Sequence, residues 1–222
     1  MVIAIDGPAG TGKSTVARRI AREAKLFYIN SGNFYRAVTW KVLHDGVSPD
    51  DQESIVRLAR GTDITIANGH IHIDGENHEK ELRSDRVDQW VAQHSAIPEV
   101  RDVVNDRLRA ISHSLDVIVE GRDISTVVFP DADVKIYLDA DVETRARRRF
   151  DENTSTLSLQ EIEQRIAERD KRDRTKKTGA LKIAEDALYL DTSDLTIDQV
   201  CETVINTIRK TGKNQELQDS HE

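Results

Sequence analysis

The chain has 222 residues, of which 37% are hydrophobic and 32% are charged, and its formal net charge is −8. This length suits one domain with a small insertion, and no apolar run approaches the roughly 20 residues that span a bilayer. The negative charge disfavours a polynucleotide partner, and a single cysteine, Cys201, excludes an internal disulfide. We therefore expect a cytoplasmic protein without a signal peptide, a membrane anchor or a nucleic-acid partner.

A glycine-rich phosphate-binding motif follows the first predicted strand. The G-x-x-x-x-G-K-[ST] spacing is matched without a mismatch, after the apolar run 2–5 and before a predicted helix at 16–24. Glycines let the loop amides curl around a phosphate, and the following helix N-terminus favours an anion. A glycine-rich turn with a chance Lys-Ser is the alternative, which the flanking strand and helix disfavour. The pattern predicts an ATP-binding loop made of Gly7, Pro8, Ala9, Gly10, Thr11, Gly12, Lys13, Ser14 and Thr15.

The next part of the chain, up to residue 112, predicts a mostly helical segment with one hairpin. Asn68-Gly69 lies between two stretches that alternate apolar and polar residues, which is a strong hairpin signal. Because this hairpin breaks the alternation of strands and helices, we place it in an inserted lobe on the substrate side. The expected elements are a strand at 26–30, a helix at 31–43 capped by Ser31, a helix from 49 to 61, a hairpin at 63–74 and helices over 79–112.

The remainder returns to alternating strands and helices. Such alternation predicts an α/β fold with a central parallel sheet, which binds its ligands at the carboxyl edge of the strands. The polar end of the chain, 211–222, is expected to be disordered. The predicted elements are strands at 116–120, 134–138 and 187–191, and helices at 141–153, 158–174 and 197–208.

Three stretches at predicted strand or helix edges carry side chains suited to phosphate binding. Arg36 lies near the start of a helix, after Ser31-Gly32. Arg122 and Asp123 directly follow a strand, and the run 168–174 (ERDKRDR) ends a helix. Arginine fits a phosphate because its planar guanidinium donates two parallel charge-assisted hydrogen bonds. Clustered arginines in an acidic chain favour a small phosphorylated substrate over a nucleic acid.

Six motifs in this order resemble the bacterial cytidylate kinases, which are P-loop nucleoside monophosphate kinases: IDGPAGTGKST, NSGNFYR, IPEVR, EGRDISTVVFPDADVKIYLDA, ERDKRDR and LDTSDLTIDQV. The resemblance covers about residues 2–208. It implies a three-layer P-loop NTPase-type fold with a central parallel sheet, a small inserted monophosphate-binding lobe and a helical lid. Within one domain, 1–210, the core would comprise 1–36, 110–144 and 184–210, the lobe 37–109, and the lid 145–178.

The resemblance also implies an activity, the transfer of the ATP γ-phosphate to CMP or dCMP with UMP as a poorer acceptor. Lys13 and Ser14 would hold the donor phosphates and Mg²⁺, with Ser14 as the metal ligand. Arg147 and Arg148 match the start of the lid that closes over the donor. No general base is needed, because an ionised monophosphate is already a nucleophile. A monomer is the default expectation for such a chain.

The acceptor site is implied residue by residue. Arg101 falls where the family contacts the cytosine, and Asp123 falls where it reads the base. A fixed carboxylate at Asp123 would favour the 4-amino group of cytosine over the 4-carbonyl of uracil, because uracil would leave groups unpaired. The positions that match contacts to the acceptor's phosphate or ribose hydroxyls are Ser31, Arg36, Arg122, Arg169 and Asp173.

Four single positions depart from the residues usual in that family, and Gly179-Ala180-Leu181 stands where the family usually has Ala-Pro-Leu. The departures leave the donor chemistry intact and bear on the affinity for the acceptor. The four single positions are Asn30 in place of Asp, Ala92 in place of a base-reading Ser, Ser125 in place of Gly and Lys176 in place of Arg.

Other interpretations fit parts of this pattern. A P-loop alone also suits a kinase for another small acceptor, or a switch module that hydrolyses its nucleotide slowly. A switch needs a water-positioning residue and partner-facing loops, and it has no use for an arginine-rich acceptor cavity. Structural roles also exist for single residues: Arg36 and the runs 145–149 and 165–174 as solvated helix faces, Arg101 paired with Asp102 or Glu99, and Arg122 paired with Asp123.

Overall fold

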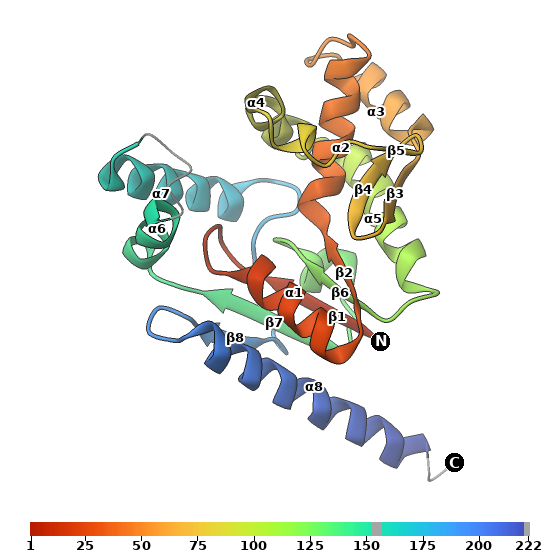
Figure 1. Ribbon diagram of the computed structural model, residues 1–222. Helices are drawn as coiled ribbons and strands as arrows, with labels where there is room; N and C mark the ends of the chain where they lie inside the picture. The colour runs from red at the N-terminus through yellow and green to blue at the C-terminus, as the bar shows by residue number, and fades with distance from the viewer. Residues whose placement is uncertain (152–156, 220–222) are drawn as a thin grey trace. The chain divides into compact units, whose positions relative to one another are not determined.

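The computed structural model describes residues 1–151 and 157–219, and it divides the chain into two compact units (Figure 1). The first unit comprises residues 1–29 and 114–222, and the second comprises residues 30–113. The second unit contains the expected lobe, 37–109, and begins earlier because the whole helix α2 (Ser31–His44) packs against other elements of that unit.

The first unit is built on a five-stranded sheet with the strand order β2-β6-β1-β7-β8. Strands β6, β1, β7 and β8 run parallel to one another. Ile5 pairs with Glu120, and Asp6 pairs with Tyr137, so the carboxyl ends of β1, β6 and β7 meet at one edge. The strands are β1 (Val2–Asp6), β2 (Phe27–Asn30), β6 (Val117–Glu120), β7 (Val134–Asp139) and β8 (Leu188–Asp191).

One face of this sheet carries an apolar core, which two helices cover (Figure 1). Ile3 and Ile5 of β1 are fully buried, as expected for a parallel strand covered on both faces. Ile20 from α1 and Val204 from α8 pack into the same cluster. The helices of this unit are α1 (Lys13–Ala24), α6 (Val142–Asp151), α7 (Leu159–Thr175) and α8 (Ile197–Asp219), with a π-helical turn at Ile124–Val128.

The second unit is mostly helical, with α2 packed against its neighbouring helices and strand β4. Its small antiparallel sheet contains the predicted hairpin. The turn residues Asn68 and Gly69 have φ angles of 54° and 79°, in the left-handed region that a two-residue hairpin turn requires. The elements are α3 (Gln52–Gly61), β3 (Ile64–Ala67), β4 (His70–Ile73), β5 (Glu76–Asn77), a 3₁₀ turn (Glu81–Arg83), α4 (Asp85–His94) and α5 (Pro98–Ser112).

The structure differs from the sequence expectations in a few places. Ser31 is the first residue of α2 and Asn30 occupies the cap position, so the predicted cap was wrong by one residue. Helix α8 continues to Asp219, so the helix predicted at 197–208 was too short, and the disorder predicted for 211–222 stays a prediction. Residues 220–222 lie outside the described part. No helix among the described residues is long and apolar enough to cross a bilayer.

Candidate active site

The predicted phosphate-binding loop joins β1 to α1 at the carboxyl edge of the sheet. Three of its glycines, Gly7, Gly10 and Gly12, have φ angles of 146°, 84° and 88°, which L side chains rarely adopt. At Gly7 the requirement is also steric, because a Cβ would lie 2.0 Å from the Leu138 carbonyl oxygen of β7. The loop therefore starts in contact with the neighbouring strand and has the backbone conformation of an anion-binding turn.

Lys13 is the first residue of α1, and its side chain is folded against its own loop. Only 5% of the residue is exposed, and Nζ donates a hydrogen bond to the Pro8 carbonyl oxygen at 2.6 Å. Burial, together with the nearby positive charge of Arg122, holds the pKa of the Lys13 amine well below its ordinary value. A phosphate at this loop would offer the buried ammonium a stronger, charged acceptor than the carbonyl does.

Ser14 provides a half-exposed hydroxyl immediately after Lys13. No group of three or more His, Cys, Asp or Glu side chains suited to a metal ion occurs in the described ranges 1–151 and 157–219. Mg²⁺ in kinase sites is typically held by substrate phosphates with one or two protein oxygens rather than by a protein cage. The residues present therefore fit a magnesium ion that arrives with the nucleotide.

A cluster of two arginines and one carboxylate joins the end of β6 to α7. Arg122 Nε donates to Asp173 Oδ2 at 2.9 Å, and Arg169 Nε lies 4.0 Å from the same oxygen. Burial alone would raise the pKa of the Asp173 carboxyl, but the charge and hydrogen bond of Arg122 outweigh it, so this pKa is lowered. Arg122 thus forms its ion pair with Asp173 of α7, in place of the pairing with Asp123 that was an alternative, and its Nη1 donates to the Gly121 carbonyl at 3.2 Å.

Asp123 and the turn after it are fixed by a carboxylate from the end of β1. Asp6 accepts hydrogen bonds from the backbone amides of Ile124 (2.9 Å) and Ser125 (2.7 Å) and from the Ser125 hydroxyl (2.6 Å). Burial raises the pKa of the Asp6 carboxyl, and the bonds from Ser125 partly offset this. The departure at position 125 thus adds one donor to Asp6. Asp123 itself is buried, and its carbonyl accepts from Val127 at 2.9 Å.

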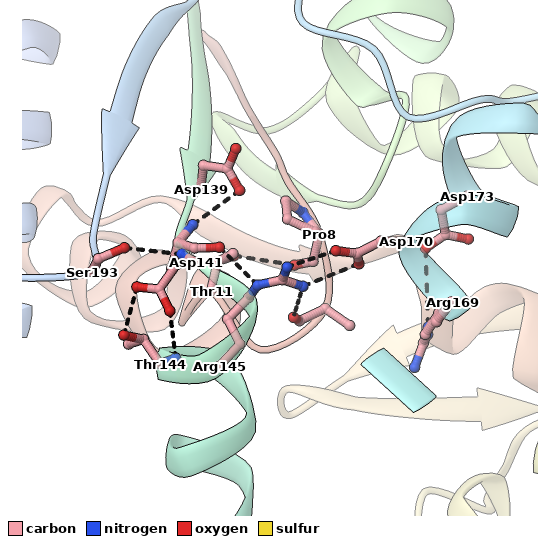
Figure 2. Close-up of polar contacts among 12 residues, drawn as sticks. Pro8, Thr11, Asp139, Asp141, Thr144, Arg145, Arg169, Asp170, Asp173 and Ser193 are labelled. Atoms are coloured by element: carbon pink, nitrogen blue, oxygen red, sulfur yellow. Dashed lines mark hydrogen bonds and ion pairs between the residues drawn. The ribbon is translucent and has the colours of Figure 1, made fainter. Parts of the chain in front are cut away.

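Three of the four arginines of α6 have different environments. Arg147 pairs with Glu143 on the exposed surface of the helix at 2.8 Å. Arg148 donates to the Thr192 carbonyl at 2.5 Å and to its hydroxyl at 3.2 Å. Arg145 is buried, and Figure 2 shows it between Asp170 of α7 and the phosphate-binding loop. The structure therefore does not bring Arg147 to the Arg122 cluster. The predicted lid, 145–178, includes residues 152–156, which lie outside the described residues.

In the second unit, Arg36 is held in place on α2. Its Nη2 lies 2.5 Å from Asp88 Oδ1, and its Nη1 donates to the Leu82 carbonyl at 2.8 Å. The side chain is 24% exposed, so Arg36 is not a solvated surface arginine. Ser31, at the start of the same helix, is buried.

Arg101 lies on the buried stripe of α5 in the same unit. The residue is 3% exposed, and its guanidinium carbon lies 5.3 Å from the centre of the Tyr35 ring. Its Nη1 donates to the Ser95 carbonyl at 3.2 Å. A buried arginine stacked on a tyrosine is a rigid planar donor, which suits recognition of a planar group.

Comparison with known families decides the identity. The model of the family described as cytidylate kinase matches residues 3–210 of the chain. The chain belongs to the cytidylate kinase family. The predictions of the family, the α/β fold class and a kinase activity that phosphorylates CMP or dCMP with ATP are therefore confirmed.

Similar proteins cover nearly the whole chain. The cytidylate kinase of Caldanaerobacter subterraneus subsp. tengcongensis is 44% identical over 216 residues, which are 96% of each chain. The bifunctional pantoate ligase/cytidylate kinase of a Synechococcus strain is 39% identical over 219 residues, and the match spans 94% of this chain and 41% of that protein. A solved structure of an uncharacterized protein from Eubacterium ventriosum has the same fold, with a TM-score of 0.51, 13% identity and coverage of 94% and 98% of the two chains.

Sequence reasoning missed the buried pair Arg145–Asp170 in this cytidylate kinase family member. A signal was present, because Asp170 continues the buried stripe of α7 after Ile162 and Ile166 at intervals of four residues. A carboxylate at an apolar position needs a buried cationic partner. Which arginine of α6 supplies it depends on how the two helices pack, and no local pattern distinguishes Arg145 from Arg147.

Proposed function

We propose that this kinase binds the ATP phosphates with the loop at residues 7–15 and the acceptor monophosphate with Arg122, Arg169 and Arg36. The observation that carries the proposal is the Arg122–Asp173–Arg169 cluster, which follows β6. Strand β6 pairs with β1 in parallel register, Ile5 opposite Glu120, and the phosphate-binding loop follows β1. Donor and acceptor phosphates both need positive charge, and adjacent strand ends supply it from two directions.

Transfer between two phosphates needs positioning and charge stabilisation rather than a covalent protein intermediate. Lys13 would neutralise charge on the donor's β- and γ-phosphates, and Arg122 would orient the attacking oxygen of the acceptor. Mg²⁺, held by Ser14 and the nucleotide, supplies further charge neutralisation when bound. Arg147 and Arg148 remain predicted donor contacts of the lid, and we assign no residue as general base.

Three residues are assigned to the acceptor's base and sugar, and a fourth to its phosphate. Asp123 would accept a hydrogen bond from the 4-amino group of cytosine, and Arg101 would contact the ring. Ser31 would bind the acceptor phosphate. Asp173 would accept hydrogen bonds from the ribose hydroxyls in addition to the one that it accepts from Arg122. Asp123 is buried, and a carboxylate that accepts from the 4-amino group of cytosine cannot accept from the 4-carbonyl of uracil, which supports the proposal that UMP is a poorer acceptor than CMP.

The proposal is tested first by an acceptor panel. We expect fast ADP production with ATP, Mg²⁺ and either CMP or dCMP, slower production with UMP, and none above the acceptor-free blank with AMP or GMP. Turnover that matches the blank with every nucleotide would contradict the acceptor assignment and would favour a slow NTPase switch. Turnover only with a different small phosphate would favour the related kinase alternative.

The base-reading role predicts a change of selectivity in Asp123→Ala. The ratio of kcat/KM for CMP to that for UMP should fall by about tenfold or more, because the variant has no fixed acceptor for the 4-amino group. The measurement is the same coupled assay with both acceptors. Asp186→Ala, which removes an exposed carboxylate of the same unit, should leave the ratio unchanged. An unchanged ratio in Asp123→Ala would remove this residue as the base reader.

The remaining expectations concern the oligomeric state, the cellular location and the partners of the enzyme. A monomeric state, a cytoplasmic location and the lack of nucleic-acid or membrane partners stay predictions.

A further inference from the structure

Arg145 of α6 donates hydrogen bonds from all three nitrogens of its guanidinium group. Its Nη1 and Nη2 donate to the two oxygens of Asp170 at 3.0 and 2.6 Å. Its Nε donates to the Ala140 carbonyl at 2.9 Å, and Nη1 also reaches the Ala9 carbonyl at 3.1 Å. We call Arg145 and Asp170 the clamp; their side chains are 2% and 4% exposed.

A buried ion pair of this kind is a costly way to hold two helices together. Removing two charges from water offsets much of their attraction, and an apolar pair of similar volume often stabilises a protein as well or better. Holding α6 to α7 therefore does not by itself account for the clamp. An apolar side chain could not reproduce the hydrogen bonds that Arg145 donates to the Ala140 and Ala9 carbonyls, and the bond to Ala9 reaches the phosphate-binding loop.

This bond fixes the direction of one peptide group of the loop. The chain has no cis peptide bond, and in a trans peptide the carbonyl and the next amide point in opposite directions. Because the Ala9 carbonyl points to Arg145, the N–H of Gly10 points away from it. Gly10 is exposed, and a Cβ there would lie 3.2 Å from the Arg145 Cβ, so loop and helix are in close contact.

We propose that Arg145, held by Asp170, is a positioning residue that orients the Ala9–Gly10 peptide so that the Gly10 amide faces the donor phosphates. This inference rests on the proposed donor site at residues 7–15. Without the guanidinium, the Ala9–Gly10 peptide can rotate and turn a carbonyl oxygen toward the phosphates, which repels them. The clamp thus acts on the nucleotide through the loop backbone.

A second carboxylate of α7 also holds an arginine of the first unit. Asp173 lies three residues after Asp170 and holds Arg122. Residues one turn apart on a helix lie near one another. The segment 170–173 therefore supports the donor loop through Arg145 and the acceptor arginine Arg122 directly.

The test compares conservative variants of the clamp with matched controls. Asp170→Asn removes the charge that holds Arg145, and Arg145→Lys keeps the charge and removes the planar fork. We expect KM for ATP to rise by about tenfold in each, with KM for CMP within about twofold of wild type. Asp186→Asn and Arg19→Lys change exposed ion pairs of the same unit and should leave both KM values unchanged.

The split between the two KM values separates positioning from folding. A purely structural clamp would lower the melting temperature and the active fraction and leave KM for ATP unchanged, which would overturn the proposal. If neither variant folds, the wild-type enzyme decides: the Gly10 amide resonance should shift strongly on titration with ADP, and an unmoved resonance would overturn the proposal. Failure of the donor site itself is recognised separately, by a Lys13→Ala variant whose KM for ATP is normal.

Discussion

Lys13→Ala should lower kcat/KM by about two to four orders of magnitude while the fold stays intact. The ammonium is the one full positive charge inside the phosphate-binding loop, and it is already buried and held at the Pro8 carbonyl before any phosphate arrives. Loss of a preorganised donor to the transferring group raises the barrier by about 3 to 5 kcal/mol. A coupled assay of ADP production with ATP and CMP measures the effect.

The control for this variant is Lys210→Ala, which removes an exposed lysine of α8 and should leave turnover unchanged. Circular dichroism and thermal melting show whether Lys13→Ala keeps the fold. Because burial lowers the pKa of the Lys13 amine, removal of the amine takes away a desolvated group and should not reduce stability. Near-normal turnover of a folded Lys13→Ala variant would contradict the assignment of this loop as the site of the donor phosphates.

Arg122→Lys should lower kcat/KM for CMP by about two to three orders of magnitude, although it keeps the charge. In the structure Nε of Arg122 donates to Asp173 at 2.9 Å and Nη1 donates to the Gly121 carbonyl at 3.2 Å, so two contacts orient the planar guanidinium. A lysine cannot bind Asp173 and present a two-pronged donor to a phosphate at the same time. KM for ATP should stay within about twofold of wild type, because this residue is assigned to the acceptor.

Arg209→Lys, an exposed change on α8, is the matched control for this substitution. Steady-state kinetics with each substrate varied in turn give both KM values. An Arg122→Lys variant that loses affinity for ATP and keeps its affinity for CMP would move Arg122 to the donor side. Full activity with both substrates would leave Arg122 with a purely structural role at Asp173.

The donor loop was predictable from the sequence because everything it needs is local. Its glycine spacing, the strand before it and the helix after it lie within residues 2–24, and the glycines have the expected positive φ angles. The hairpin at Asn68-Gly69 was predictable for the same reason, since two consecutive residues determine its turn.

The partners of the site residues were not predictable, because they come from distant parts of the chain. Arg122 and Asp173 were both singled out, but the sequence offered Asp123 as the nearer partner of Arg122. Asp6 was part of a recognised motif, yet its role as acceptor for the turn at Ser125 depends on strand order. Which arginine of α6 is buried depends on the packing of α7, which residue spacing within α6 does not encode.

The strand order of the sheet also has a consequence for folding of the enzyme during its synthesis on the ribosome. Strand β1 is made first, but its two neighbours are β6 and β7, which end at Glu120 and Asp139. Residues 30–113, which lie in the chain between β1 and β6, form a compact unit with contacts of its own. The inserted unit can thus fold during synthesis before β6 and β7 are available to pair with β1. The phosphate-binding loop, which follows β1, has no neighbouring strands until then.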